Sequence, residues 1–162
     1  MHDVAVDIMA PILPNEGLGG FRLRTGIIEI QRFIRYLEMQ SALSYKPYNL
    51  FVVRYMLEND TVSIDVDVRN GKIFQLMAGR AYQGLLFGTI KVGMPVKEAM
   101  AFDPRLYYDE VEEVILCKGC PGVSLNVPEI DPPPELVPEM VIDAISVYIA
   151  EIDTYNAQYG YW

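Results

Sequence analysis

The chain has 162 residues, is 51% hydrophobic and carries a formal net charge of -9 at pH 7. This length is typical of a single domain, and the apolar content is too high for a disordered acidic tail. A chain with this charge lacks the excess of Lys and Arg that phosphates and anionic lipids attract, which argues against nucleic-acid and membrane binding.

The N-terminal region contains acidic residues and prolines rather than the basic start and long apolar run of a signal peptide. No stretch of the chain is apolar enough to cross a bilayer, so we expect a cytoplasmic location. Within this region, apolar and polar residues alternate over Val4–Ile8, which predicts a short strand that Pro11 and Pro14 end.

An amphipathic helix is predicted next. Apolar residues recur at helical spacing between Ile27 and Leu37, and charged residues lie between them. We expect this helix to start near Gly26, with Thr25 as its cap. The segment Ser44–Asn49 is rich in turn-forming residues and predicts a loop.

Strands are predicted after this loop, at Leu50–Leu57 and Val62–Arg69. The Asn70-Gly71 dipeptide favours a hairpin, with Lys72–Met77 as its return strand. The return strand does not alternate cleanly, which indicates either a bulge or a sheet covered on both faces.

The second half of the chain begins with a glycine-punctuated segment, and Pro95 is then expected as the first residue of a short helix. Val114–Cys117 and Val123–Val127 predict a second hairpin. Residues 128–138 contain five prolines, which predicts an extended, irregular segment. The apolar residues of Ala144–Ile152 fit a strand or a helix, and their many β-branched side chains favour the strand.

An internal repeat is visible at an offset of 69 residues. Identical residues align at Gly19 and Gly88, Glu29 and Glu98, and Phe33 and Phe102. Each copy has a glycine turn, a short strand, a helix and then antiparallel strands. We therefore expect one α+β domain over residues 1–162, with an antiparallel sheet, helices on one side of it, and two repeat halves at residues 15–83 and 84–162.

Residues 88–100, GTIKVGMPVKEAM, resemble the strand-turn-helix entry of tandem-repeat modules such as the β-lactamase inhibitory protein and the outer-membrane assembly lipoproteins. They also resemble a motif of small cytoplasmic immunity proteins of bacterial toxin systems. The resemblance implies a repeated α+β fold and a protein-binding role. The first copy has Arg24 where the second has Gly93, and the motif contains no functional side chain that transfers to this sequence.

Cys117 and Cys120 form a C-x-x-C motif, which is typical of redox sites and of zinc sites. The motif falls in a predicted hairpin turn, whereas reactive thiols usually lie at helix N-termini. A structural zinc ion needs four ligands, and the chain adds only His2, its single histidine, to the two thiols. We favour turn residues with one thiol facing inward, and we expect no metal.

The sequence matches a calcium-binding loop only in part, and its single histidine limits the catalytic mechanisms that it can support. Asp65 and Asp67 precede Asn70-Gly71 in a segment similar to a calcium loop, but Arg69 occupies a ligand position, so we expect outward-facing strand residues. A single histidine removes most Ser-His and Cys-His mechanisms. We expect no catalytic residue and no cofactor.

The acidic residues are concentrated in residues 103–162, which hold 12 Asp and Glu against two basic residues. Two tyrosines followed by four carboxylates stand out in this stretch, and tyrosines are frequent interface anchors while carboxylates steer basic partners. The alternative is a solvated loop and strand edge. The predicted partner-binding residues are Tyr107, Tyr108, Asp109, Glu110, Glu112 and Glu113.

The leading hypothesis is a protein that neutralises a basic protein partner, as an immunity protein does when it inhibits a nuclease-type toxin. The acidic bias follows from such a target, because nuclease clefts are basic to bind their substrate. The alternatives are an enzyme of another class that uses pocket carboxylates and tyrosines, and a structural or assembly subunit. The oligomeric state is left open.

Overall fold

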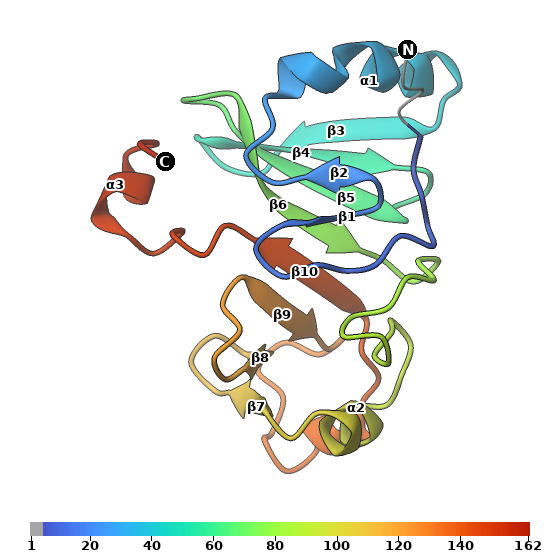
Figure 1. Cartoon of the computed structure of the whole chain (residues 1–162), viewed down its shortest axis with the longest axis vertical. Coiled ribbons are helices and arrows are strands. Elements are labelled where there is room, and N and C mark those ends of the chain that lie inside the picture. Colours follow the sequence, from blue (N-terminus) through green and yellow to red (C-terminus); the bar gives the residue numbers. More distant parts are fainter. Residues whose placement is uncertain (1–4) are drawn as a thin grey trace.

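The computed structural model describes residues 5–162 and has a mixed α+β fold (Figure 1). The strands of the main sheet are β3 (Leu43–Pro47), β4 (Val52–Leu57), β5 (Val62–Asp67), β6 (Lys72–Ala78), β7 (Leu106–Asp109), β8 (Val114–Cys117), β9 (Val123–Asn126) and β10 (Ala144–Tyr148). They form one antiparallel eight-stranded sheet in the order β3-β4-β5-β6-β10-β9-β8-β7. The expected α+β class with an antiparallel sheet is confirmed.

The remaining elements surround this sheet. Two short strands pair with each other as a separate small sheet, β1 (Gly17–Leu18) and β2 (Phe21–Arg22). The helices are α1 (Gln31–Met39), α2 (Val96–Phe102) and α3 (Tyr155–Gln158), with 3-10 helices η1 (Ile27–Ile30) and η2 (Val137–Glu139). Within residues 5–162, no helix is long and apolar enough to span a membrane.

The main sheet consists of two four-stranded meanders that meet at its centre. The first, β3 to β6, follows α1, and the second, β7 to β10, follows α2. The last strands of the two meanders pair with each other, and Leu76 of β6 lies opposite Val147 of β10. The offset of 69 residues aligns Gly26 with Pro95, the extended residues that precede η1 and α2.

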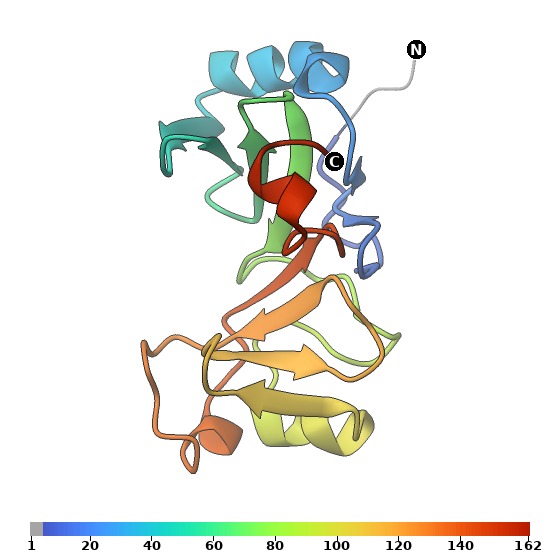
Figure 2. The same ribbon diagram turned by 90° about the vertical axis from the view of Figure 1, so that its left-hand side faces the viewer.

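One face of the sheet is covered and the other is open. Side chains alternate across a strand, and the register puts Ile64, Leu76 and Val147 on the same face. That face supplies the strand residues of the single hydrophobic core, to which α1 contributes Phe33 and α2 contributes Val96. Both helices therefore cover this side, and Figure 2 shows the strands of the second meander in front of α2. The short helix α3 instead lies beside Asp67 and Arg69, toward the open face, so the expectation of helices on one side holds for α1 and α2.

The helix predicted at residues 27–37 is present, with two differences. Its first turn is η1, a 3-10 helix, and the α-helix continues from Gln31. The cap is Gly26 rather than Thr25, because the Glu29 carboxylate accepts a hydrogen bond from the Gly26 N–H at 3.2 Å. In a capping box, this is the hydrogen bond from the backbone N–H of the cap residue to the side chain three residues later. It does not require a hydroxyl group on the cap residue.

One strand prediction and one loop prediction were wrong. Residues 5–7 of the predicted strand Val4–Ile8 have no regular structure, and Val4 lies outside the described residues. The predicted loop Ser44–Asn49 instead contains most of β3, which forms one edge of the sheet. Pro47 fits there because an edge strand leaves one row of backbone groups unpaired, so the missing N–H of proline costs little.

The hairpin predictions are largely confirmed. Asn70 and Gly71 lie in a loop of residues 68–71 between the paired Asp67 and Lys72. The pairing shifts along β6, since Asp65 lies opposite Gln75 and Val66 opposite Ile73, so the expected bulge is present. Pro95 precedes α2 as its cap instead of beginning it.

In the C-terminal third, β8 pairs with β9 as predicted, and the final apolar segment is a strand, β10. The proline-rich residues 128–136 are irregular as expected, and η2 follows them.

Candidate functional site

The six predicted binding residues lie on the hairpin formed by β7 and β8. β7 is the edge strand of the second meander, and residues 110–113 form the loop. Tyr107 lies opposite Leu116, and Tyr108 lies opposite Ile115, which is fully buried. Because neighbouring side chains point to opposite faces, the structure separates the two tyrosines: Tyr107 lies on the open face and Tyr108 on the covered face.

Tyr108 anchors the hairpin to the core. Its ring packs against the buried cluster, and burial is the main reason that the pKa of its phenol is raised, with smaller contributions from Glu113 and Asp131. Tyr107 is 36% exposed. The ammonium of Lys118 lies 5.7 Å from the centre of the Tyr107 ring, within the range of a cation–π contact. Of the two tyrosines, Tyr107 is the more exposed one and lies on the open face.

The carboxylates of the hairpin divide into two groups. Asp109 Oδ1 accepts the N–H groups of Val111 and Glu112, both at 3.0 Å, so Asp109 shapes the loop. Glu113 Oε2 accepts the N–H of Asp131 at 2.9 Å. Glu110 and Glu112 are exposed and make no ion pair within residues 5–162. These two side chains are therefore the ones available to a partner.

Two exposed aliphatic side chains lie beside these carboxylates, and sequence reasoning missed both. Val111 is 87% exposed in the hairpin loop, and Ile130 is 91% exposed in the proline-rich segment. The hydrogen bond from Asp131 to Glu113 holds the two segments together. In the sequence, each aliphatic residue stands between acidic residues, and only the fold shows that neither packs inward. We call residues 109–113 and 129–131 the acidic tip.

The open face at the other end of the sheet carries paired charges. Arg54 of β4 binds Asp65 of β5 through two hydrogen bonds, at 2.7 and 2.8 Å, and Lys46 of β3 lies opposite Arg54. Asp65 and Asp67 point to the open face as expected for strand residues, but both are buried, at 4% and 3% exposure. This corrects the expectation that they face outward to solvent.

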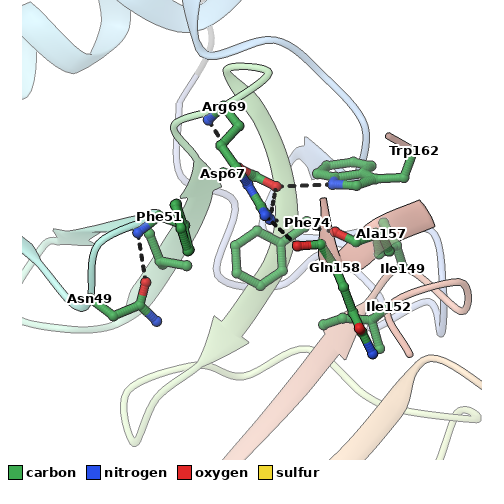
Figure 3. A pocket seen from close by; sticks show the side chains of 11 residues that line it. Asn49, Phe51, Asp67, Arg69, Phe74, Ile149, Ile152, Ala157, Gln158 and Trp162 are labelled. Atoms are coloured by element: carbon green, nitrogen blue, oxygen red, sulfur yellow. Dashed lines mark hydrogen bonds and ion pairs between the residues drawn. The ribbon is translucent and has the colours of Figure 1, made fainter. Parts of the chain in front are cut away.

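The C-terminal segment folds back onto the first meander and forms a pocket of about 230 Å³ (Figure 3). The Trp162 indole packs edge-on against Phe74, with 6.4 Å between ring centres. Its N–H donates to Asp67 Oδ2 at 3.1 Å, and Arg69 binds the same carboxylate through two hydrogen bonds, at 2.9 and 2.8 Å. Trp162 thus belongs to the half of the sheet remote from the acidic tip and does not extend it.

Asp67 is held in its ionised form. Burial disfavours its charge, but the hydrogen bonds from Arg69 and Trp162 outweigh burial and lower the pKa of the carboxyl. A general acid or base near neutral pH needs a pKa close to 7. The pocket is therefore better suited to holding the C-terminal segment than to acid–base chemistry.

The C-x-x-C motif lies in a turn at the end of β8, as predicted. Cys117 is buried and Cys120 is half-buried, and both are free thiols. Among residues 5–162, no group of three or more His, Cys, Asp and Glu side chains is placed to hold a metal ion. His2, the remaining candidate ligand, lies outside the described residues.

Comparison with known proteins identifies one similar fold. The structure is similar to the crystal structure of yfeY, an uncharacterized protein from Escherichia coli, with a TM-score of 0.54 over 84% of this chain and 98% of that chain. The two sequences are 14% identical, so the similarity concerns the fold alone. No family model and no curated protein matches the chain. The resemblance of residues 88–100 to repeat modules and immunity proteins is not tested by this match and stays a prediction.

Proposed function

We propose that this chain is a protein-binding protein that engages a basic protein through the acidic tip. The observation that carries the proposal is the exposure of Val111 and Ile130 between the carboxylates of Glu110, Glu112 and Glu129. Apolar anchors surrounded by charged groups have the composition of a protein interface, with an apolar centre and a polar rim. Val111 and Ile130 are two of the four large apolar side chains that are more than 80% exposed within residues 5–162, and the hydrogen bond from Asp131 to Glu113 joins the segments that carry them.

The charge of the tip favours a cationic partner. Residues 103–148, which include the strands of the second meander, hold ten acidic residues against two basic ones, so a basic protein is attracted to this end of the molecule from a distance. A nuclease-type toxin is the partner class that we propose, because carboxylates can occupy the positions that substrate phosphates take in a cationic cleft. Binding there would block access of the nucleic acid and neutralise the toxin.

The position of the tip is suited to reaching into a cleft. It projects from the edge strand β7, and Asp109 and Glu113 hold its two segments in shape through backbone hydrogen bonds. Tyr107 lies beside it on the open face and adds a partly exposed aromatic surface. A preformed binding loop loses less conformational entropy when it binds than a flexible one does.

The experiment compares two double variants with the wild-type protein. Glu110→Lys with Glu112→Lys reverses the exposed charges of the tip, and Glu38→Lys with Glu98→Lys makes the same charge change on the exposed faces of α1 and α2. Each protein is immobilised, exposed to a lysate of the source cells, and its bound proteins are identified by mass spectrometry.

We expect the wild-type protein and the helix variant to retain a basic protein that the tip variant loses. Nuclease activity of the retained protein should fall in proportion to added wild-type chain. Equal retention by all three proteins, or a retained partner that is acidic, would contradict the proposal. Retention of a basic protein without nuclease activity would reject a nuclease-type toxin as the partner but would still support a basic protein as the partner.

A further inference from the structure

The C-x-x-C turn has the backbone geometry of a closed dithiol loop. The Cys120 N–H donates to the Cys117 carbonyl at 3.2 Å, which defines a four-residue turn. Gly119, the third residue, has φ of 73°, a left-handed conformation that glycine adopts without strain. Such a turn places its first and last Cα atoms within about 7 Å, and a disulfide needs about 4.4–6.8 Å. The Cα separation of such a turn is therefore compatible with a disulfide.

The two thiols differ in their environment. Cys117 is 7% exposed and packs in the hydrophobic core, whereas Cys120 is half-buried. Burial raises the pKa of the Cys117 thiol, although the nearby Arg105 guanidinium acts in the opposite direction. The thiolate is the reactive form, so Cys117 reacts slowly with a reagent from solvent. Cys120 is therefore the thiol that reacts first with an oxidant from solvent.

Cys120 packs against the core on one side and lines a surface hollow on the other. A hollow of about 400 Å³ lies beside the turn, bounded by Tyr107, Leu116 and Tyr148. Lys118, between the cysteines, donates its N–H to the Arg105 carbonyl at 3.0 Å, so the turn is tied to the start of β7. The sheet thus holds the turn in place. The half-buried thiol of Cys120 is partly accessible to solvent.

We propose that Cys117 and Cys120 are a redox modification site, at which a low-molecular-weight disulfide oxidises the two thiols to an intrachain disulfide. This inference stands independently of the proposed binding function.

The reaction proceeds by two exchanges. The Cys120 thiolate, after losing its proton to solvent, attacks one sulfur of glutathione disulfide, and one glutathione leaves as a thiolate that takes up a proton. Cys117 then loses its proton and attacks the Cys120 sulfur, which breaks the mixed disulfide and releases the second glutathione. The protein loses two electrons and two protons, and one glutathione disulfide becomes two glutathiones.

The test uses the full chain, reduced and then incubated with mixtures of glutathione and glutathione disulfide at neutral pH. Free thiols are blocked with a maleimide, and intact mass and peptide mapping identify the products. We expect the folded protein to lose both thiols together, to become lighter by two hydrogen atoms, and to yield a peptide linked between Cys117 and Cys120. Dithiothreitol should restore both thiols.

Two variants establish the order of the steps. Cys117→Ser should accumulate a stable mixed disulfide with glutathione at Cys120, because the resolving thiol is missing. Cys120→Ser should react more slowly than Cys117→Ser, because its remaining thiol is buried. Equal rates in the two variants would contradict the assignment of Cys120 as the attacking thiol.

A measurement on the same chain in urea separates the effect of the fold from the effect of sequence proximity. If the turn is preorganised, the folded protein should form the disulfide at a lower proportion of glutathione disulfide than the unfolded chain does. The proposal is overturned if the folded protein keeps both thiols under conditions that oxidise the unfolded chain, or if it forms only mixed or intermolecular disulfides.

Discussion

The indole N–H of Trp162 donates a hydrogen bond to the Asp67 carboxylate across 3.1 Å, and this contact connects the C-terminal segment to the end of β5. Lys72 adds a hydrogen bond from its ammonium to the Trp162 carbonyl oxygen at 3.2 Å. Asn70 donates its side-chain amide to the Gly160 carbonyl at 3.1 Å. The loop between β5 and β6 is therefore the docking site of residues 157–162, and Trp162, the single tryptophan, reports on it by fluorescence.

Asp67→Asn should release this segment. The amide carries no charge for Arg69 and has one oxygen in place of two, so we expect a loss of about 2 kcal/mol in the free energy of unfolding, measured in urea. The emission of Trp162 should shift to longer wavelength as the indole enters water. Asp153→Asn, at an exposed position, is the control and should leave both quantities unchanged.

Acid should weaken the same contact in a defined pH range. The folded pKa of Asp67 lies below the ordinary value of 3.8, because hydrogen bonds from Arg69 and Trp162 outweigh burial. A lowered folded pKa means that the stabilisation is complete above the ordinary pKa and is lost as the pH falls through the folded one. Trp162 emission should therefore stay constant from neutral pH down to about pH 5 and change only below the ordinary pKa. A midpoint well above pH 4 would contradict this assignment.

The ion pair between Arg54 and Asp65 should respond unequally to loss of each partner. Asp65 is 5% exposed at its side chain and Arg54 is 19% exposed. Arg54→Met leaves a buried carboxylate whose remaining partner is the Gln75 amide at 3.4 Å, so we expect a cost of about 3 kcal/mol in unfolding free energy. Asp65→Asn keeps a hydrogen-bond acceptor for Arg54 and should cost about 1 kcal/mol.

The exposed pair of Lys97 and Glu139 offers a matched comparison, because both side chains are more than half exposed. Lys97→Met should change stability by less than the error of a urea titration, since exposed pairs contribute little. If Arg54→Met lowers the free energy of unfolding as little as Lys97→Met does, burial does not determine how much an ion pair contributes to stability.

The two adjacent tyrosines of β7 should have separable roles. Tyr108→Ala removes the ring that packs against the core, so it should lower the urea midpoint of the whole protein. Tyr107→Ala should leave the midpoint unchanged and speed dissociation of the captured basic partner, because a partly exposed contact residue is lost. A reversal of the two phenotypes would mean that the register of β7 is not the one described.

Much of the sheet was predictable from the sequence, because its signals are local. Alternation identified β5, the Asn70-Gly71 dipeptide identified a hairpin, and β-branched residues identified β10. β3 was missed because Pro47 and its turn-forming neighbours suggest a loop, and only pairing with β4 makes the segment a strand. The repeated order of helix and strands was visible at the offset of 69 residues.

The candidate site was predictable only in part. The run of carboxylates after Tyr108 is visible in the sequence, but composition cannot show that Tyr107 and Tyr108 face opposite sides of the sheet. Nor can it show that Asp109 and Glu113 are used internally, since their partners are backbone N–H groups. Ile130 joins the site through a contact 18 residues apart in the chain, which no local pattern encodes.

Amide hydrogen exchange with and without the captured basic partner locates the binding surface most directly. Binding through the acidic tip predicts slower exchange in residues 107–116 and 129–131, and unchanged exchange in α1 and β3. The same experiment on the variant with Glu110→Lys and Glu112→Lys should show no slowing at either segment. Slower exchange over α1 or β3, with none in the hairpin, would show that the partner binds elsewhere and would contradict the proposed function.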